Sequence, residues 1–313
     1  MKKYLGGLFC FVIVFGVFLL RPQIDYQLLG IWADGIWIWN QFADTWTKIP
    51  STSNAMMVTA GNVDGDDADD IIGVWPSGLW ICNSSDGKWV HLSHAIPNSI
   101  AIGDFIHIGR DDIIGSWPND GVYLRDSSAG KWEKIASSAR LLAAGDIDGD
   151  KQDDLIGYWD SGLWVRYGGK TGWKKIDSPV PVSVAVGDMT GSGRGNIVIS
   201  SEAGTLYLDH ETAKWKKITT PAEQLAVGDI DGDGRDDLIG AWPSGLSVRY
   251  GGRNQWQPIK ISSIPKWIVA GKISMNLNAF GKVDDPVNYP LGSDMKMNII
   301  ELSMNGPGGT GIK

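Results

Sequence analysis

The sequence is poor in cysteine. Only Cys10 and Cys82 occur among its 313 residues, and Cys10 lies within the apolar N-terminal segment. Neither has the paired spacing of a zinc or iron–sulfur site, and Cys82 has no second cysteine outside that segment. We therefore expect no structural disulfide and no thiolate metal site.

Histidine is also scarce, and common catalytic motifs are missing. The four histidines are scattered, and no G-x-S-x-G or H-E-x-x-H sequence occurs; they are His91, His94, His107 and His210. His91 and His94 are three residues apart, so in a regular strand they would point to opposite faces. The sequence favours a non-enzymatic protein. The alternative is a surface hydrolase on a propeller scaffold, because an active site assembled across a fold leaves no linear motif.

An excess of basic residues is absent too. The chain has 28 Lys and Arg against 36 Asp and Glu, a formal net charge of -8 and a pI near 5.0. No basic stripe runs along it, so we do not expect it to bind nucleic acid. Residues 28–273 also lack a helical period, and the 41 glycines and 16 tryptophans indicate tight turns and aromatic packing.

One long hydrophobic run does occur, at the N-terminus. Lys2 and Lys3 precede the uncharged stretch Tyr4–Leu20, which as a helix would span roughly 25 Å against a hydrocarbon core of ~30 Å. We interpret residues 1–26 as a signal or anchor segment with a short linker. An uncleaved anchor is favoured over a cleaved signal peptide, and a buried helix is a third alternative. Either targeting function places the remainder of the chain outside the cytoplasm, secreted or at the cell surface.

The main feature that is present is an internal repeat. A Gly-x-Trp element recurs at Gly30, Gly73, Gly115, Gly157 and Gly240, with Ile199-Ser-Ser201 in the remaining copy, at spacings of 41 to 43 residues. A second tryptophan keeps the same period; the series is Trp46, Trp89, Trp132, Trp173, Trp215 and Trp256. A period near 42 residues fits four short strands per repeat. We predict an all-β protein, a β-propeller with six blades over residues 27–275, with seven blades as the alternative.

The ends of the repeat array suggest how the ring closes. The first copy starts at its second strand, whereas Trp267–Gly271 follows the last copy as an unmatched first strand. Pairing of these two stretches would complete the first blade and remove two free edges. Residues 276–313 break the period and are predicted to form a partly flexible C-terminal extension.

Acidic loops precede several of the second strands. In 229-DIDGDGRDD-237 the acidic residues stand at places one, three, five, eight and nine, and oxygen ligands at alternate places of a tight loop suit calcium. Three loops carry full sets: Asn62, Asp64, Asp66 and Asp70; Asp146, Asp148, Asp150 and Asp154; Asp229, Asp231, Asp233 and Asp237. The seventh place would add a backbone carbonyl, from Ala68, Gln152 or Arg235. We predict about three structural Ca²⁺ sites. The eighth-place acids Asp69, Asp153 and Asp236 are expected to point away from them.

The remaining loops have lost this pattern. Ile106 and Ile108 replace ligands in residues 104–112, whereas residues 188–196 keep neutral oxygens but little charge. After Gly271 the set is absent. Intact and altered loops therefore alternate around the predicted ring.

The unit VGDIDGDGRDDLIGAW resembles the FG-GAP/VCBS repeats of integrin-α-like β-propellers, over about residues 28–273. This resemblance implies that the loop joining the first two strands of a blade holds calcium structurally, at the twelve positions given above. The WPSGLW and GKW elements are similar to those of tryptophan-rich propeller lectins.

Taken together, the sequence features predict a binding or adhesion module whose partner is a glycan or a surface or extracellular protein, with membrane contact only through the N-terminal segment. The alternative within this class is a lectin with Trp-lined pockets between blades. The aromatic candidates of the third strands are Trp37, Trp39, Trp80, Tyr123 and Trp164. Packing between blades is the favoured interpretation of these rings, and stacking on sugars is the alternative.

Overall fold

The computed structural model describes residues 27–273, except residues 42, 67, 107, 169–171, 252 and 254. The predicted N-terminal segment (1–26) and C-terminal extension (276–313) lie outside this range. Within the described residues all regular structure is β-strand, and no helix is long and apolar enough to cross a membrane.

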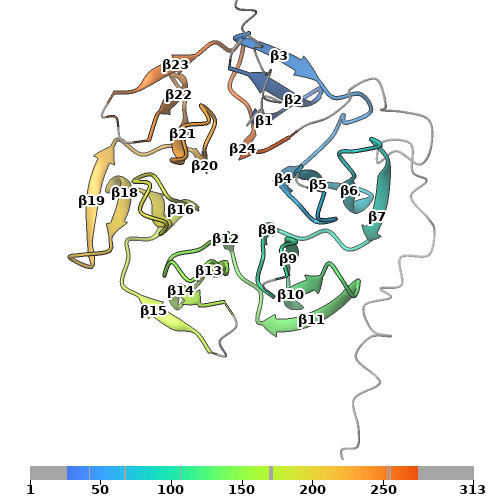
Figure 1. Cartoon of the computed structure of the whole chain (residues 1–313), viewed down its shortest axis with the longest axis horizontal. Helices are drawn as coiled ribbons and strands as arrows, with labels where there is room; N and C mark the ends of the chain where they lie inside the picture. The colour runs from blue at the N-terminus through green and yellow to red at the C-terminus, as the bar shows by residue number, and fades with distance from the viewer. Residues whose placement is uncertain are drawn as a thin grey trace, which may run out of the picture.

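Six four-stranded antiparallel sheets stand around a common axis as the blades of a propeller (Figure 1). This arrangement confirms the predicted fold and decides for six blades.

The four strands of each blade are named below in order from the innermost, next to the axis, to the outermost. Blade 1 consists of β24 (Trp267–Gly271), β1 (Gln27–Trp32), β2 (Gly35–Asn40) and β3 (Thr45–Lys48). Blade 2 consists of β4 (Met57–Gly61), β5 (Asp70–Trp75), β6 (Gly78–Cys82) and β7 (Trp89–Ser93). Blade 3 consists of β8 (Ser99–Gly103), β9 (Asp112–Trp117), β10 (Gly121–Asp126) and β11 (Lys131–Ala136). Blade 4 consists of β12 (Leu141–Gly145), β13 (Asp154–Trp159), β14 (Gly162–Arg166) and β15 (Lys174–Ile176). Blade 5 consists of β16 (Pro181–Gly187), β17 (Asn196–Ser201), β18 (Gly204–Asp209) and β19 (Lys214–Thr219). Blade 6 consists of β20 (Gln224–Gly228), β21 (Asp237–Trp242), β22 (Gly245–Arg249) and β23 (Gln257–Ile259).

The ring closes as the sequence predicts. Strand β24 pairs antiparallel with β1, in a register that runs from Gln27 opposite Gly271 to Ile31 opposite Trp267. The Trp267 indole also donates to the carbonyl of Val58 at 2.8 Å, which ties the closing strand to blade 2. The first blade is thus built from both ends of the described chain.

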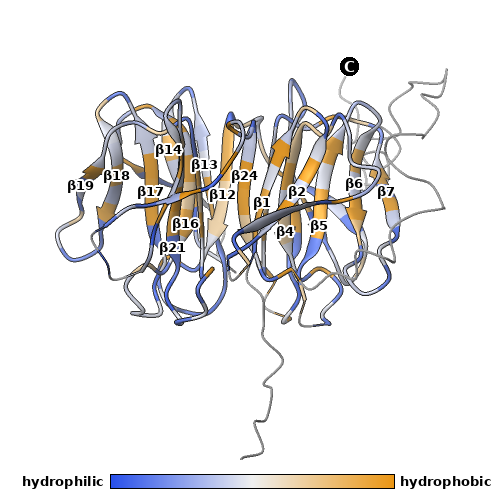
Figure 2. Ribbon diagram, turned by 90° about the horizontal axis from the view of Figure 1, so that it is seen from above, coloured by the Kyte–Doolittle hydropathy of each residue, from blue (hydrophilic) through white to orange (hydrophobic). Residues whose placement is uncertain are grey.

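The hydrophobic core lies between adjacent blades. Strands β5 and β9 are buried along their whole length, and apolar clusters join each blade to the next. In side view the apolar residues occupy the strands, whereas the loops at both ends are more polar (Figure 2). Sheets covered on both faces explain why these strands read as apolar runs rather than as alternating patterns.

The Gly-x-Trp element is an interlock between a blade and the connection that precedes it. In five blades the tryptophan ring lies over the glycine two residues earlier; in blade 4 a Cβ on Gly157 would lie 2.2 Å from Trp159. The Trp159 indole donates to the carbonyl of Ser137, 22 residues earlier, at 2.9 Å.

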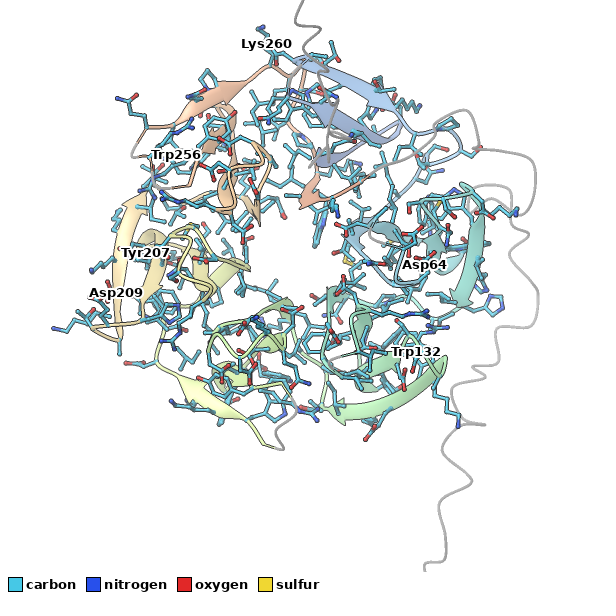
Figure 3. The ribbon with its side chains drawn as sticks, in the orientation of Figure 1. Asp64, Trp132, Tyr207, Asp209, Trp256 and Lys260 are labelled. Carbon is cyan, nitrogen blue, oxygen red and sulfur yellow. The ribbon has the colours of Figure 1, made fainter. Side chains whose placement is uncertain are left out.

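The same rings pack edge-to-face against the second tryptophan series. The centroid distances are 4.8 Å for Trp32–Trp46, 5.0 Å for Trp75–Trp89, 5.2 Å for Trp117–Trp132, 4.8 Å for Trp159–Trp173 and 5.0 Å for Trp242–Trp256. Trp132 and Trp256 lie toward the outer rim of the ring (Figure 3).

Blade 5 replaces both members of the interlock together. Ile199 stands in place of the glycine and Ser201 in place of the tryptophan. Both are buried, with exposures of 0% and 1%. The glycine is therefore needed to make room for the tryptophan side chain and not to form the strand. Blade 5 has a side chain at this position because it has no tryptophan two residues later.

This explanation predicts coupling between the two positions. Gly157→Ile should destabilise the protein by about 1–3 kcal/mol, because the new side chain meets Trp159. The double variant with Trp159→Ser, which copies blade 5, should lose less than the sum of the single changes, with a coupling of about 1 kcal/mol measured by denaturant unfolding. Additive losses would contradict the explanation.

Candidate metal centres

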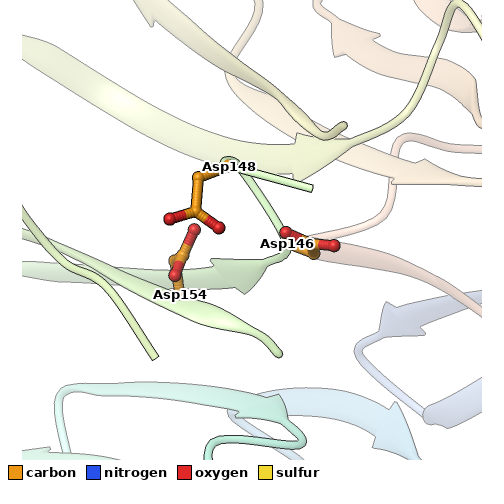
Figure 4. Close-up of side chains that lie close together, drawn as sticks. All are labelled: Asp146, Asp148 and Asp154. Carbon is orange, nitrogen blue, oxygen red and sulfur yellow. The ribbon is translucent and has the colours of Figure 1, made fainter. Parts of the chain in front are cut away.

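The acidic loops connect the first strand of a blade to its second, so the topology places them all on one face of the ring. In blade 4 carboxylate oxygens of Asp146, Asp148 and Asp154 lie within 4.8 Å of one another (Figure 4). In blade 6 Asp229, Asp231 and Asp237 do the same. Calcium binds oxygens at about 2.3–2.6 Å, so two ligands on opposite sides of one ion are roughly 4.8 Å apart. Both clusters therefore have the dimensions of a calcium site.

The first-place aspartate shapes each loop. Asp146 accepts hydrogen bonds from the backbone N–H groups of Gly149, Asp150 and Lys151 at 2.6, 3.2 and 2.8 Å. Gly149 has a φ of 80°, a left-handed conformation that glycine adopts without steric cost. The Asp146 side chain thus holds the turn, and these hydrogen bonds fix one side of the cluster.

The ninth-place aspartate anchors the cluster to the blade. Asp154 is fully buried; its Oδ2 accepts from the N–H of Ile147 at 2.9 Å and its Oδ1 from that of Gly168 at 2.7 Å. Asp237 is held in the same way by Ile230 and Gly251. Burial raises the pKa of Asp154 to about 6 and that of Asp237 to about 7, and the neighbouring acids add to this effect. A cation in the cluster would favour the ionised form.

The fifth-place acids do not join the three-carboxylate clusters. Asp150 and Asp233 are exposed, and each accepts the N–H of the residue two places on, Gln152 or Arg235, at 3.0 Å. The structure thus brings together three of the four predicted side chains in each of these loops. Spacing alone could not show this difference, because an Asx turn competes for the same oxygen.

Loop 62–70 forms the same turn with an amide in first place. The Asn62 Oδ1 accepts from Gly65 and Asp66 at 2.7 and 3.1 Å, and the ninth-place Asp70 is fully buried. Burial raises the pKa of Asp70 to about 6. Asp64 accepts a hydrogen bond from the Asn83 side chain, and Asp66 accepts from Ala68 at 3.1 Å. This loop therefore offers one carboxylate fewer than the other two.

In the altered loops the first-place aspartate accepts hydrogen bonds from its own turn, whereas the buried ninth-place oxygens Asp112 Oδ2 and Asn196 Oδ1 have no hydrogen-bond partner in the described part of the chain. In loop 188–196 the Thr190 hydroxyl donates to Asp188 at 3.0 Å, and Ser192 lies 3.4 Å from the same oxygen. In loop 104–112 the side chains of Ile106 and Ile108 are 41% and 46% exposed. In both loops the first-place aspartate still holds the turn. The loop therefore keeps its shape although the full set of ligand residues is absent.

The eighth-place acids have a function that the sequence did not reveal. Each points into the preceding blade, where its Oδ2 accepts the backbone N–H of that blade's first-place residue. The pairs are Asp69 with Lys272, Asp111 with Asn62, Asp153 with Asp104 and Asp236 with Asp188, at 2.6, 2.8, 2.9 and 2.6 Å. Burial raises the pKa of Asp111 to about 7, and it raises that of the other three as well.

A glycine accompanies this contact but does not identify it, because Gly145 and Gly228 also end inner strands and face Val186 and Ala270 instead of a carboxylate. A glycine ends the inner strand of each preceding blade, and a Cβ there would lie within 3.0 Å of the carboxylate; these residues are Gly61, Gly103, Gly187 and Gly271.

The third-strand aromatics divide into two groups. Trp80 is fully buried and Trp39 is 5% exposed, so both belong to the packing between blades and not to an accessible site. Trp37, Tyr123 and Trp164 are half-buried. The polar atom of each of these three bonds the side chain three residues earlier, which is Asp34, Asp120 or Ser161, at 3.1, 2.8 and 3.0 Å.

The histidine pair of blade 2 corrects an expectation. The rings of His91 and His94 lie 4.2 Å apart, centroid to centroid, although their spacing predicts opposite faces. The pairing of β6 with β7 shifts between Leu79 and Trp80, and the extra residue reverses the alternation.

The raised pKa values predict how calcium and pH act together. Without metal, the folded protein binds more protons than the unfolded chain between about pH 4 and 7, so its unfolding free energy falls as the pH rises through that window. With ~2 mM free calcium and a Kd of ~0.1 mM, each site would add about 1.8 kcal/mol. A chelator should therefore lower the Tm by several degrees near pH 7.5 and by less near pH 5.5, as measured by calorimetry.

Asp231→Asn should remove part of the calcium-dependent rise in Tm. The matched control is Asp160→Asn, because that side chain is 81% exposed and lies outside the loops. An unfolding transition that is identical in calcium and in chelator would contradict the assignment.

The comparisons with known proteins support the fold. No protein-family model matches the chain, and no curated protein matches it. Among solved structures, a chain of the nidogen/laminin complex is 10% identical with a TM-score of 0.59, covering 79% of this chain and 98% of that chain. TolB from Acinetobacter baumannii is 10% identical with a TM-score of 0.55, covering 78% and 66%. BBS1N from its complex with ARL6DN is 9% identical with a TM-score of 0.52, covering 76% and 78%. At these identities the likeness is one of fold: this chain is a six-bladed β-propeller.

Proposed function

We propose that the chain is a calcium-stabilised, extracytoplasmic β-propeller of the FG-GAP/VCBS type that acts as a non-enzymatic binding module. One observation carries this proposal. Two three-carboxylate clusters of calcium dimensions occupy equivalent places in blades 4 and 6, and a third loop of the same shape occupies that place in blade 2.

Calcium is the cation that best suits these loops. All donors are oxygens, which disfavours zinc and copper, and a flexible loop suits calcium better than the strict octahedron of magnesium. Three divalent ions would bring the formal net charge from -8 to -2. They would also offset the cost of burying Asp70, Asp154 and Asp237, which are fully buried.

The proposed location follows from the sequence and from calcium supply. The uncharged stretch Tyr4–Leu20 behind two lysines is typical of an export signal or anchor. Calcium sites of modest affinity are filled at extracellular concentrations. We propose residues 1–26 as that segment, residues 27–275 as the propeller and residues 276–313 as an extension.

A binding function is supported better than catalysis. The gathered carboxylates belong to the loops, where backbone N–H groups hold them, and Asp154 and Asp237 are inaccessible to a substrate. The described histidines lie outside the two carboxylate clusters: His91 and His94 are in blade 2, and His210 follows the third strand of blade 5, where its Nε2 is 2.8 Å from the carbonyl of Gly195 in loop 188–196.

The half-buried aromatics are the candidate contacts for a glycan, which would make the module a lectin. Each ring lies between an acid or hydroxyl three residues before it and a lysine eleven residues after it. The Lys134 ammonium is 5.7 Å from the Tyr123 ring, and the Lys175 ammonium is 5.9 Å from the Trp164 ring. An aromatic face flanked by polar groups can stack on a sugar ring and bond its hydroxyls. An extracellular protein is the other proposed partner.

A glycan array in calcium tests this binding surface. We expect at least one glycan to bind, and Trp37→Ala or Trp164→Ala to weaken it about tenfold or more in a titration of intrinsic fluorescence. Trp256→Phe is the control, because that ring packs against Trp242. Failure to bind any glycan on a broad array would contradict the lectin proposal and favour a protein partner. Turnover of a bound glycan would contradict the non-enzymatic one.

A further inference from the structure

The three intact acidic loops each make a two-point contact with the blade before them. In every case the eighth-place carboxylate accepts the N–H of a first-place residue, and its own N–H donates back to the carbonyl of that residue. The returning bonds are 2.9 Å for Asp69 to Lys272, 3.1 Å for Asp153 to Asp104 and 2.9 Å for Asp236 to Asp188. The eighth place therefore belongs to two blades at once.

These contacts have a direction around the ring. The intact loops lie in blades 2, 4 and 6, and the blades that they hold, 1, 3 and 5, carry altered loops. At the interface between blades 4 and 5 the eighth place is Gly195, so only a backbone bond to the carbonyl of Asp146 remains, at 2.6 Å. Asp111 makes the same two-point contact with Asn62 of blade 2, with both bonds at 2.8 Å, although its own loop lacks the ligand set. The contact can therefore form without a cation site, and only the other three can depend on calcium.

The position of the eighth-place residue couples this contact to the cation site. In blade 6 Asp236 stands between Arg235, whose carbonyl occupies the predicted seventh place, and Asp237, a member of the carboxylate cluster. An ion bound by the carbonyl of Arg235 and by the carboxylate of Asp237 would hold the backbone of Asp236, which lies between them in the sequence.

We propose that calcium in each intact loop fastens the preceding blade through the eighth-place aspartate. The inference rests on the proposed calcium sites. The ring then consists of three fastened pairs of blades, 1 with 2, 3 with 4 and 5 with 6. In the first pair Asp69 holds Lys272, the residue that follows β24, so calcium in loop 62–70 also secures the strand that closes the ring.

Hydrogen–deuterium exchange of the full chain, with and without calcium, tests this proposal. In the wild type calcium should slow exchange at least about tenfold in peptides covering residues 187–193 and 270–273, which contain the N–H groups of Asp188 and Lys272. Asp236→Ala should abolish the effect at 187–193 and leave it at 270–273. Asp69→Ala should do the reverse, so each variant is the control for the other.

The outcomes separate this inference from the proposed function. If calorimetric titration shows calcium binding but exchange at both wild-type sites is unchanged, the fastening is wrong and the calcium sites stand. Calcium protection that survives unaltered in both variants also overturns the fastening. If calcium does not bind, both proposals fall. If a variant does not fold, the exchange of the wild type with and without calcium at residues 187–193 and 270–273 decides whether the fastening exists.

Discussion

The structure depends on contact between blades, because no blade can cover both of its own apolar faces. Strands β5 and β9 are buried throughout only because neighbouring sheets lie on either side. The first and last blades must therefore also pack against each other, so the blades form a closed ring. Pairing of β24 with β1 meets it by bringing the two ends of the described chain into one sheet. In five of the six blades the tryptophan indole then bonds a carbonyl of the connection before the blade.

A second constraint comes from the acids on one face. A first-place aspartate or asparagine holds each turn and an eighth-place aspartate contacts the preceding blade. The same loops bury carboxylates, and burial raises the pKa of Asp111 and that of Asp237 to about 7. A bound cation would resolve this conflict in the intact loops. In loop 188–196 it is reduced another way, since Asn196 and Gly195 replace the ninth- and eighth-place acids. Loop 104–112 keeps both acids without the ligand set, and burial there raises the pKa of Asp111 to about 7 and that of Asp112 to about 6.

Much of this could be predicted from the sequence because the repeat multiplies each weak signal. The period gave four strands per blade, the unmatched strand Trp267–Gly271 gave the closure, and the Asp spacing gave the loops. The errors and omissions arose where a side chain had two possible partners. Asp150 and Asp233 bond their own turns, and Asp236 serves the neighbouring blade instead of its own loop. The His91–His94 contact depends on a register shift between β6 and β7 that the sequence pattern does not predict.

The central claim is that alternate loops of the ring hold calcium. Native mass spectrometry of the full chain, exchanged from calcium-containing buffer, tests it most directly by counting ions. We expect three bound calcium ions, the weakest in loop 62–70, where Asn62 stands in the first place instead of an aspartate. Asp148→Asn and Asp231→Asn should each reduce the count by one. A chain that carries no calcium, or one ion for every blade, would show that the alternate loops are not the calcium sites.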